Sequence, residues 1–264
     1  MTEWDDLQIR VHGESAHPTL IYLPGVHGDW TLVGSFRAAI RKHVRFVEFT
    51  YPRTRTWSID DHACKVLQKL SAHNIREGWL LAESFGSVIA WALVDQAAAN
   101  NFDVRGIILS GGFVRYPYFF VVRFARAMNR AVPLWFIKLV CWFYGRYALL
   151  RHRHAPETLE CVSEFARRRS EESDRDAMCY RYGLILQSDP RQLAQNSAIP
   201  VYQLCGLVDP IVPWFPVRRW LKRHCPEHTQ WRLVWRADHN VLGTAPRTAA
   251  EQVLCWMGAS AWPS

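Results

Sequence analysis

The chain of 264 residues lacks the features that mark secreted, disulfide-bonded or membrane-spanning proteins. Its seven cysteines are an odd, scattered set without a Cys-x-x-Cys pair, which indicates reduced cysteines in a cytoplasmic protein. Residues 1–6 are acidic and include no apolar segment, so we expect no secretory signal. The most apolar stretch, residues 131–144, is too short to span a bilayer and carries Lys138.

Metal and cofactor motifs are also missing. His152 and His154 alternate with arginine and make a poor metal pair, so we expect neither a metal nor an organic cofactor. The net charge of +8 favours anionic partners, yet no nucleic-acid motif accompanies it, and we expect no nucleic-acid binding. Repeats and low-complexity segments are absent, and nothing in the sequence indicates an oligomeric state.

What is present is an alternation of strand and helix patterns. Strands are predicted at residues 7–11, 19–23, 44–50, 79–83, 104–110, 201–206 and 231–235, and helices at 31–42, 58–73 and 85–99. Such alternation favours an α/β protein with a mostly parallel central sheet that is covered by helices on both faces. Ligands of these sheets bind beyond the carboxyl ends of the strands.

The most informative segment is Ala82-Glu83-Ser84-Phe85-Gly86, where an apolar strand meets a serine and an alanine-rich helix follows at once. A sharp strand-to-helix turn that exposes a serine hydroxyl needs small residues two positions before and after the serine, and Ala82 and Gly86 supply them. The other interpretation is a serine that only caps the helix.

Three further strand ends carry polar or small residues. Residues 19–23 lead into the loop 24–29, residues 201–206 lead to Asp209, and residues 231–235 lead to His239. With Ser84, the chain order is serine, acid, histidine. That order and these strand ends resemble the α/β-hydrolase superfamily, in its serine hydrolase (esterase- or lipase-like) branch.

The resemblance implies a catalytic triad. Ser84 would be the nucleophile, His239 the base that takes its proton, and Asp209 the acid that fixes the imidazole tautomer. Asp238 is discounted, because side chains adjacent in sequence usually point apart. By the same resemblance, the backbone N–H groups of Val26 and Phe85 would form the oxyanion hole. The resemblance then implies hydrolysis of carboxylic esters with an apolar acyl or alcohol part through an acyl-enzyme.

Several alternatives stay open. The same triad could cleave a thioester or a carbon–carbon bond. The fold could also serve as a non-catalytic ligand receptor or as a lipid-binding protein at a membrane surface.

An insertion interrupts the predicted sheet. Residues 113–189 have helical patterns without an obvious strand, so we expect a helical cap there and a core made of residues 1–112 and 190–264. Arg167, Arg168 and Arg169 are followed by four acidic residues, which indicates a solvated helix face.

The cap is basic and aromatic. Residues 104–156 contain nine Arg or Lys and no Asp or Glu, with Arg123, Arg126 and Arg130 at helical spacing, and Pro133 can open a second, apolar helix. One interpretation is a lid that contacts anionic lipid, which would place the protein peripherally at a membrane surface. The other, which we favour because caps must pack somewhere, is a cap whose aromatic side chains are buried against the core while its arginines are solvated.

Overall fold

The computed structural model describes residues 6–151, 156–169 and 171–259. Seven strands form one sheet in the order β1-β3-β2-β4-β5-β6-β7. Their bounds are β1 (Gln8–His12), β2 (Thr19–Leu23), β3 (Arg45–Thr50), β4 (Glu77–Glu83), β5 (Asp103–Ser110), β6 (Val201–Gly206) and β7 (Gln230–Val234). All neighbouring pairs are parallel except β1 with β3. The predicted mostly parallel sheet is confirmed.

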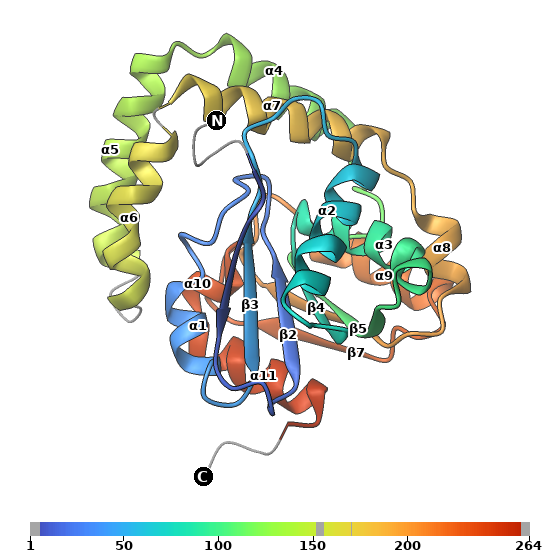
Figure 1. Ribbon diagram of the computed structural model, residues 1–264. Coiled ribbons are helices and arrows are strands. Elements are labelled where there is room, and N and C mark those ends of the chain that lie inside the picture. The colour runs from blue at the N-terminus through green and yellow to red at the C-terminus, as the bar shows by residue number, and fades with distance from the viewer. Residues whose placement is uncertain (1–5, 152–155, 170, 260–264) are drawn as a thin grey trace.

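Helices cover both faces of the sheet (Figure 1). They are α1 (Gly34–Ile40), α2 (Ile59–Ala72), α3 (Gly86–Ala97), α8 (Arg191–Asn196), α9 (Trp214–His224), α10 (Val241–Thr244) and α11 (Pro246–Met257), with a short 3-10 turn at Ala98–Asn100. The strands alternate as period-2 geometry requires: in β2, Ile21 and Leu23 join the core beneath α2 and α3, whereas Leu20 and Tyr22 join the core beneath α1 and α11.

Local hydrogen bonds account for where two helices begin. Ser58 caps α2 in a capping box, in which Asp61 N donates to Ser58 Oγ at 3.0 Å and Ser58 N donates to Asp61 Oδ2 at 2.8 Å. The helix α1 is shorter than the predicted span 31–42. Thr31 instead takes part in a turn in which its backbone N–H donates to the Asp29 carboxylate at 3.0 Å, so the helix begins only at Gly34.

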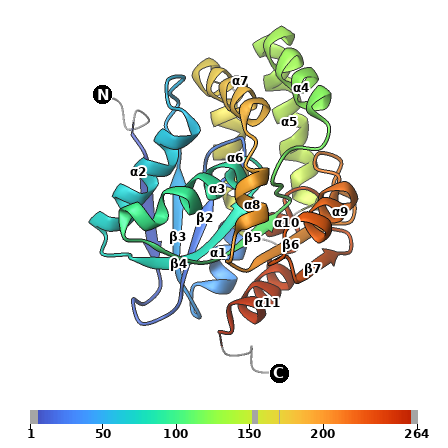
Figure 2. The same cartoon turned by 90° about the vertical axis from the view of Figure 1, so that its right-hand side faces the viewer.

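Among the described residues, five helices lie between β5 and β6 in the chain: α4 (Phe119–Ala131), α5 (Leu134–Arg151), α6 (Pro156–Arg169), α7 (Glu172–Gln187) and α8. Figures 1 and 2 show α4 and α7 side by side above the sheet, and α5 and α6 as a second helix pair at one side. We call α4, α5, α6 and α7 the cap. Within the described residues, none of the helices combines the length and apolar character needed to cross a bilayer. His152 and His154 lie outside the described residues.

The described aromatic side chains of α4 and α5 are exposed, so the interpretation that we favoured from the sequence is wrong for these two helices, whereas Phe113, Tyr116 and Phe165 in the predicted cap segment are buried. Phe120 and Phe124 of α4 are 64% and 66% exposed, and Trp135 and Trp142 of α5 are 67% and 59% exposed. The physical reason is that α5 packs along α6 rather than along the sheet, so most of its circumference faces solvent.

Candidate active site

Ser84 stands in the turn between β4 and α3, in a backbone conformation that L-residues rarely adopt. Its φ is +48°, and two residues later stands Gly86, where an added Cβ would lie 2.1 Å from the carbonyl oxygen of Leu23. Only glycine fits there, as the sequence pattern requires. Ser84 is 8% exposed, and that exposure opens into a cavity of about 310 Å³. The strained turn therefore places Ser84 in the wall of this cavity.

His239 lines the same cavity and is held by Asp209. The distance from His239 Nδ1 to Asp209 Oδ2 is 2.8 Å. The other carboxylate oxygen, Oδ1, accepts hydrogen bonds from the backbone N–H groups of Ile211 and Val212 at 2.8 and 2.9 Å. Asp238 is engaged elsewhere, because its Oδ1 accepts from Asn240 N at 3.0 Å. The structure thus brings Asp209, and not Asp238, to the histidine.

The environment favours the protonated form of His239. Burial acts to lower the pKa of the imidazole, but the hydrogen bond and the negative charge of Asp209, together with the charge of Glu83, outweigh it and raise the pKa. A base that is stabilised as an imidazolium while its Nδ1 is fixed suits proton transfer at Nε2.

The two predicted oxyanion donors belong to segments next to Ser84, one in sequence and one in space. Phe85 follows Ser84 and is fully buried at the start of α3, where backbone N–H groups have no partner within the helix. Val26 lines the cavity in the loop after β2. In that loop Gly25 is close enough that an added Cβ would touch Ser84 Cβ at 3.4 Å, so the loop backbone passes directly beside Ser84.

Buried arginines of the cap fix the loop that carries Val26. Arg181 of α7 is 2% exposed, and its Nη1 donates to the carbonyl oxygens of Val26 and His27, each at 3.0 Å. Its Nη2 donates to the carbonyl oxygen of Pro52 at 2.9 Å. The guanidinium occupies the space that a Cβ at Gly28 would need, and Gly28 has φ +78°. A side chain of the cap therefore determines the course of the loop.

The end of α6 contributes to the same attachment. Arg169 Nη2 donates to Asp29 Oδ2 at 2.6 Å, and Arg168 Nη1 lies 3.4 Å from the same oxygen. Arg168 and Arg169 are 3% and 7% exposed. The prediction of a solvated face for residues 167–169 is therefore wrong for two of the three, because buried Asp29 and Asp174 pair with them; Arg167 alone is exposed. We call Arg168, Arg169 and Arg181 the buried arginine cluster.

His27 lines the cavity as a neutral side chain. Burial lowers its pKa to about 3, and the positive charge of Arg169 adds to this effect. Its ring packs edge-to-face on Phe165 of α6, with ring centroids 5.1 Å apart. At neutral pH this histidine is a wall of the cavity and does not compete with His239 as a base.

A carboxylic acid that the sequence pattern did not single out also faces the cavity. Glu83, directly before the nucleophile, accepts a hydrogen bond from the hydroxyl of Tyr22, and burial raises its pKa. The backbone N–H of Gly25 also donates to it. Because the residue before the serine varies freely in the A-x-S-x-G pattern, no sequence signal distinguished it.

The rest of the cavity wall is mostly apolar and comes from the loops after β5 and β6, the cap helices α4 and α7, and residues beside the triad. These wall residues are Phe113, Tyr116, Val121, Val122, Ala125, Tyr182, Ile185, Pro210 and Ile211. The hydroxyl of Tyr116 donates to the carbonyl oxygen of Ile211 and so fastens the loop that carries Asp209. An apolar wall beside a nucleophile and a base can hold the hydrocarbon part of an acyl substrate.

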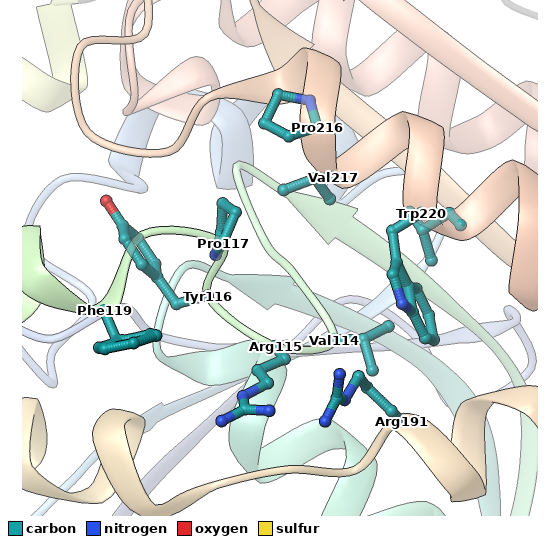
Figure 3. Close-up of a pocket in the computed structure, with 10 residues that line it drawn as sticks. Val114, Arg115, Tyr116, Pro117, Phe119, Arg191, Pro216, Val217 and Trp220 are labelled. Carbon is teal, nitrogen blue, oxygen red and sulfur yellow. The ribbon is translucent and has the colours of Figure 1, made fainter.

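A second cavity, of about 250 Å³, lies outside the catalytic region between the segment before α4 and helix α9 (Figure 3). Its two arginines, Arg115 and Arg191, are both paired with Asp189 at 2.7 to 2.9 Å. None of the triad residues lines it, so it has no part in the chemistry described above.

Comparisons with known proteins establish the fold. The sequence matches no protein-family model and no curated protein. Its structure is similar to a hydrolase from Pseudomonas aeruginosa PA01, with TM-score 0.75, 15% identity, and 96% of this chain and 94% of that chain covered. It is also similar to the esterase RhEst1 from Rhodococcus sp. (TM-score 0.71, 17% identity, 96% and 94% covered) and the enol-lactonase from Burkholderia xenovorans (TM-score 0.72, 16% identity, 96% of each chain covered). The chain has the α/β-hydrolase fold, and the prediction of fold class is confirmed.

Proposed function

We propose that this protein is a serine hydrolase that cleaves carboxylic esters with an apolar acyl or alcohol part. The observation that carries the proposal is the meeting of Ser84 and an Asp209-bound His239 at one apolar cavity. That the structural neighbours include hydrolases and esterases supports a hydrolytic role.

In the proposed reaction, Ser84 Oγ attacks the ester carbonyl while His239 Nε2 takes the hydroxyl proton. The tetrahedral oxyanion accepts hydrogen bonds from the N–H groups of Val26 and Phe85. His239 then gives its proton to the leaving alkoxide, and the carbon–oxygen bond breaks to leave an acyl-enzyme. Water attacks this ester in the second half, His239 takes its proton, and the carboxylic acid leaves as the Ser84 hydroxyl is restored.

The proposal extends to the division of the chain and to location. Residues 1–112 and 190–264 form the catalytic core, residues 113–189 form the cap, and the protein works in the cytoplasm with peripheral contact to membrane lipid. The substrate is a small apolar ester, because the cavity of about 310 Å³ holds a short hydrocarbon chain and offers few polar groups to orient a charged one.

A Ser84→Ala variant tests the nucleophile. Loss of the hydroxyl should lower kcat for p-nitrophenyl esters by roughly 10⁴-fold or more and abolish labelling by a fluorophosphonate probe, because no acyl-enzyme can form. Ser71→Ala on α2 changes a serine that does not line the cavity, and this variant should keep both the kcat for p-nitrophenyl esters and the labelling by the probe. Circular dichroism should show that both variants are folded. Labelling that persists in Ser84→Ala would place the nucleophile elsewhere.

A graded panel separates the alternative substrates. Oxygen esters and thioesters with the same acyl chains, and a 1,5-diketone as a carbon–carbon bond substrate, should be compared by kcat/KM. We expect the oxygen esters to be preferred and the optimum to lie at short chains. A protein that hydrolyses none of them and is not labelled by the probe would be a receptor on this fold.

A further inference from the structure

We propose that the outer side of helices α4 and α5 docks on a membrane surface that contains anionic phospholipid, with arginines on the lipid headgroups and aromatic rings between them. The outer cap face is defined as the exposed aromatic and basic side chains of these two helices. This docking does not depend on the proposed reaction; only its consequence for an ester substrate rests on the proposed function.

The first observation is a basic groove in which one of the four arginines, Arg115, pairs with a carboxylate, that of Asp189, and the other three do not among the described residues. A groove of about 500 Å³ runs along α4 and is lined by Arg115, Arg123, Arg126 and Arg130, with Phe119 and Leu186 between them. Arg123, Arg126 and Arg130 have no carboxylate partner among the residues that the structure describes. Arg126 is half-buried, and its Nε is an unpartnered buried atom within the described part of the chain. Unneutralised guanidinium groups around one groove favour an anionic ligand such as a phosphate ester.

The second observation is an apolar surface beside this groove. On α4, Phe120, Phe124 and Met128 follow one another at intervals of four residues and are 64%, 66% and 44% exposed. On α5, exposed apolar side chains stand on several sides of the helix: Trp135, Phe136, Leu139, Val140, Trp142, Phe143 and Tyr147. An exposed apolar surface of this extent on a monomer marks an interaction site, and Trp with Arg is the composition of membrane-interface helices.

Charge decides between a membrane and a second copy of the chain. Residues 104–156 contain nine Arg or Lys and no Asp or Glu. A symmetric dimer through this face would bring the same acid-free surface against itself, so its arginines would repel. An anionic bilayer neutralises the arginines and offers an apolar phase to the rings, and so satisfies both kinds of side chain at once.

Helix α4 connects the proposed docking face with the cavity, because its inner side lines that cavity. Val121, Val122 and Ala125 of this helix line the catalytic cavity, while Phe120 and Phe124 face outward. Figure 3 shows Arg115 on the segment that leads into α4, and Phe119, the first residue of that helix. One helix therefore separates the membrane surface from the cavity. If the proposed function holds, an apolar ester dissolved in the membrane is the substrate nearest to the nucleophile.

Vesicle sedimentation tests the docking with the full chain carrying Ser84→Ala, so that binding is read without turnover. Vesicles of phosphatidylcholine alone are compared with vesicles containing about a third phosphatidylserine. We expect binding to the anionic vesicles only, with a loss as salt rises from about 50 to about 500 mM. Replacement of Arg123, Arg126 and Arg130 by Gln should lower the partition coefficient on the order of 100-fold, because each basic residue near the surface contributes roughly fivefold.

The chain offers a matched control. Arg219, Lys222 and Arg223 are exposed on α9, outside the outer cap face, and their replacement by Gln removes the same charge. The partition coefficient of this variant on anionic vesicles should stay within a few-fold of that of the parent protein. A second variant, Phe120→Ser with Phe124→Ser, keeps all arginines and should bind the anionic vesicles weakly. Its control is Trp235→Ala, which removes a 78% exposed ring elsewhere and should bind as the parent protein does.

Other results overturn the proposal. Equal loss in the α4 and α9 arginine variants would mean attraction by net charge and not a docking face. Equal binding to both vesicle types, or no binding at low salt, would exclude the anionic surface. A dimer in light scattering that the Phe120→Ser, Phe124→Ser variant dissolves would assign the face to a second copy. Because binding is measured without turnover, failure of the esterase proposal leaves these readings unchanged.

Discussion

The cap uses arginine in two opposite ways. The buried arginine cluster, Arg168, Arg169 and Arg181, is almost free of solvent and donates to carbonyl oxygens and carboxylates of the core. The row Arg123, Arg126 and Arg130 lies one helix away, lines an open groove and pairs with no carboxylate among the described residues.

The difference follows from the cost of burying charge. A guanidinium group taken out of water must recover its hydration through hydrogen bonds, so a buried arginine specifies the positions of the groups around it. An exposed arginine loses little hydration and does not fix the positions of other groups of the protein. It remains available to bind an external anion. Substitutions in the first group should therefore change stability and catalysis, whereas those in the second should change binding to a surface.

The largest effect is expected from Arg181→Ala. Three carbonyl oxygens, those of Val26, His27 and Pro52, lose their donor, which should lower the free energy of unfolding by about 3 kcal/mol. The loop that carries the Val26 N–H should also lose its fixed course, so kcat for a short ester should fall by roughly 100-fold with a smaller change in KM. Urea denaturation and steady-state kinetics below the unfolding temperature measure the two effects.

A matched arginine on the same helix serves as control. Arg175 also donates to two backbone carbonyls, those of Val132 and Arg130 at 3.1 and 2.7 Å, but both belong to the cap. Arg175→Ala should lower stability without a comparable fall in kcat. If both variants lose kcat to the same degree, Arg181 supports the cap in general and does not position the loop.

The next effect in size is expected from Asp29→Asn. Burial acts to raise the pKa of Asp29, but Arg169, Arg168 and the hydrogen bonds from Thr31 lower it to about 2. A carboxyl with a depressed pKa stabilises the fold fully above its ordinary value near 4, and this contribution disappears as the pH falls toward 2. Removing its charge takes one carboxylate away from two buried arginines, of which Arg169 keeps Asp174 at 3.2 Å, so we expect a loss of about 3 kcal/mol at pH 7.

The pH dependence makes this prediction specific. Unfolding free energies of wild type and Asp29→Asn should differ most at neutral pH and converge below pH 4. Asp176→Asn is the control, because Asp176 also joins the cap to the core, through Arg55 at 3.0 Å, but both side chains are exposed. That variant should lose less than about 1 kcal/mol. A constant difference for Asp29→Asn from pH 7 to 3 would show that its charge is not what stabilises the loop.

The sequence was sufficient for those parts of the molecule in which one local rule acts. The strand positions, the helix at residues 58–73 and the need for a small residue at Gly86 depend on neighbours within a few residues or on one crowded turn. The acid, Asp209, was assigned by its place after a strand, and the structure brings it to His239.

Contacts between distant segments were beyond such rules. Arg168 and Arg169 stand beside acidic residues in the sequence and follow the pattern of a solvated helix, yet Asp29, about 140 residues earlier, pairs with both. Conversely, the aromatic residues of α5 were expected to be buried because apolar side chains usually are. Whether a helix finds a partner for its apolar surface depends on where the cap lies, which local pattern does not encode.

The smallest effect, and the finest test of the contrast between buried and exposed charge, is expected from Glu83→Gln. Burial raises the pKa of Glu83, and its charge is one cause of the raised pKa of His239. In the proposed reaction His239 must be neutral to accept the Ser84 proton, so we expect activity to fall as the pH drops through its pKa. Removing the Glu83 charge should bring the pKa of His239 down and move the acidic limb of kcat/KM to lower pH, on the order of half a unit.

Tyr22→Phe, which removes the donor that favours the Glu83 carboxylate, should move the acidic limb of kcat/KM in the same direction by less. Removal of Arg123 should leave it in place, since that charge lies in the outer groove. A limb that is unmoved in Glu83→Gln would mean that this carboxyl is already neutral when His239 titrates.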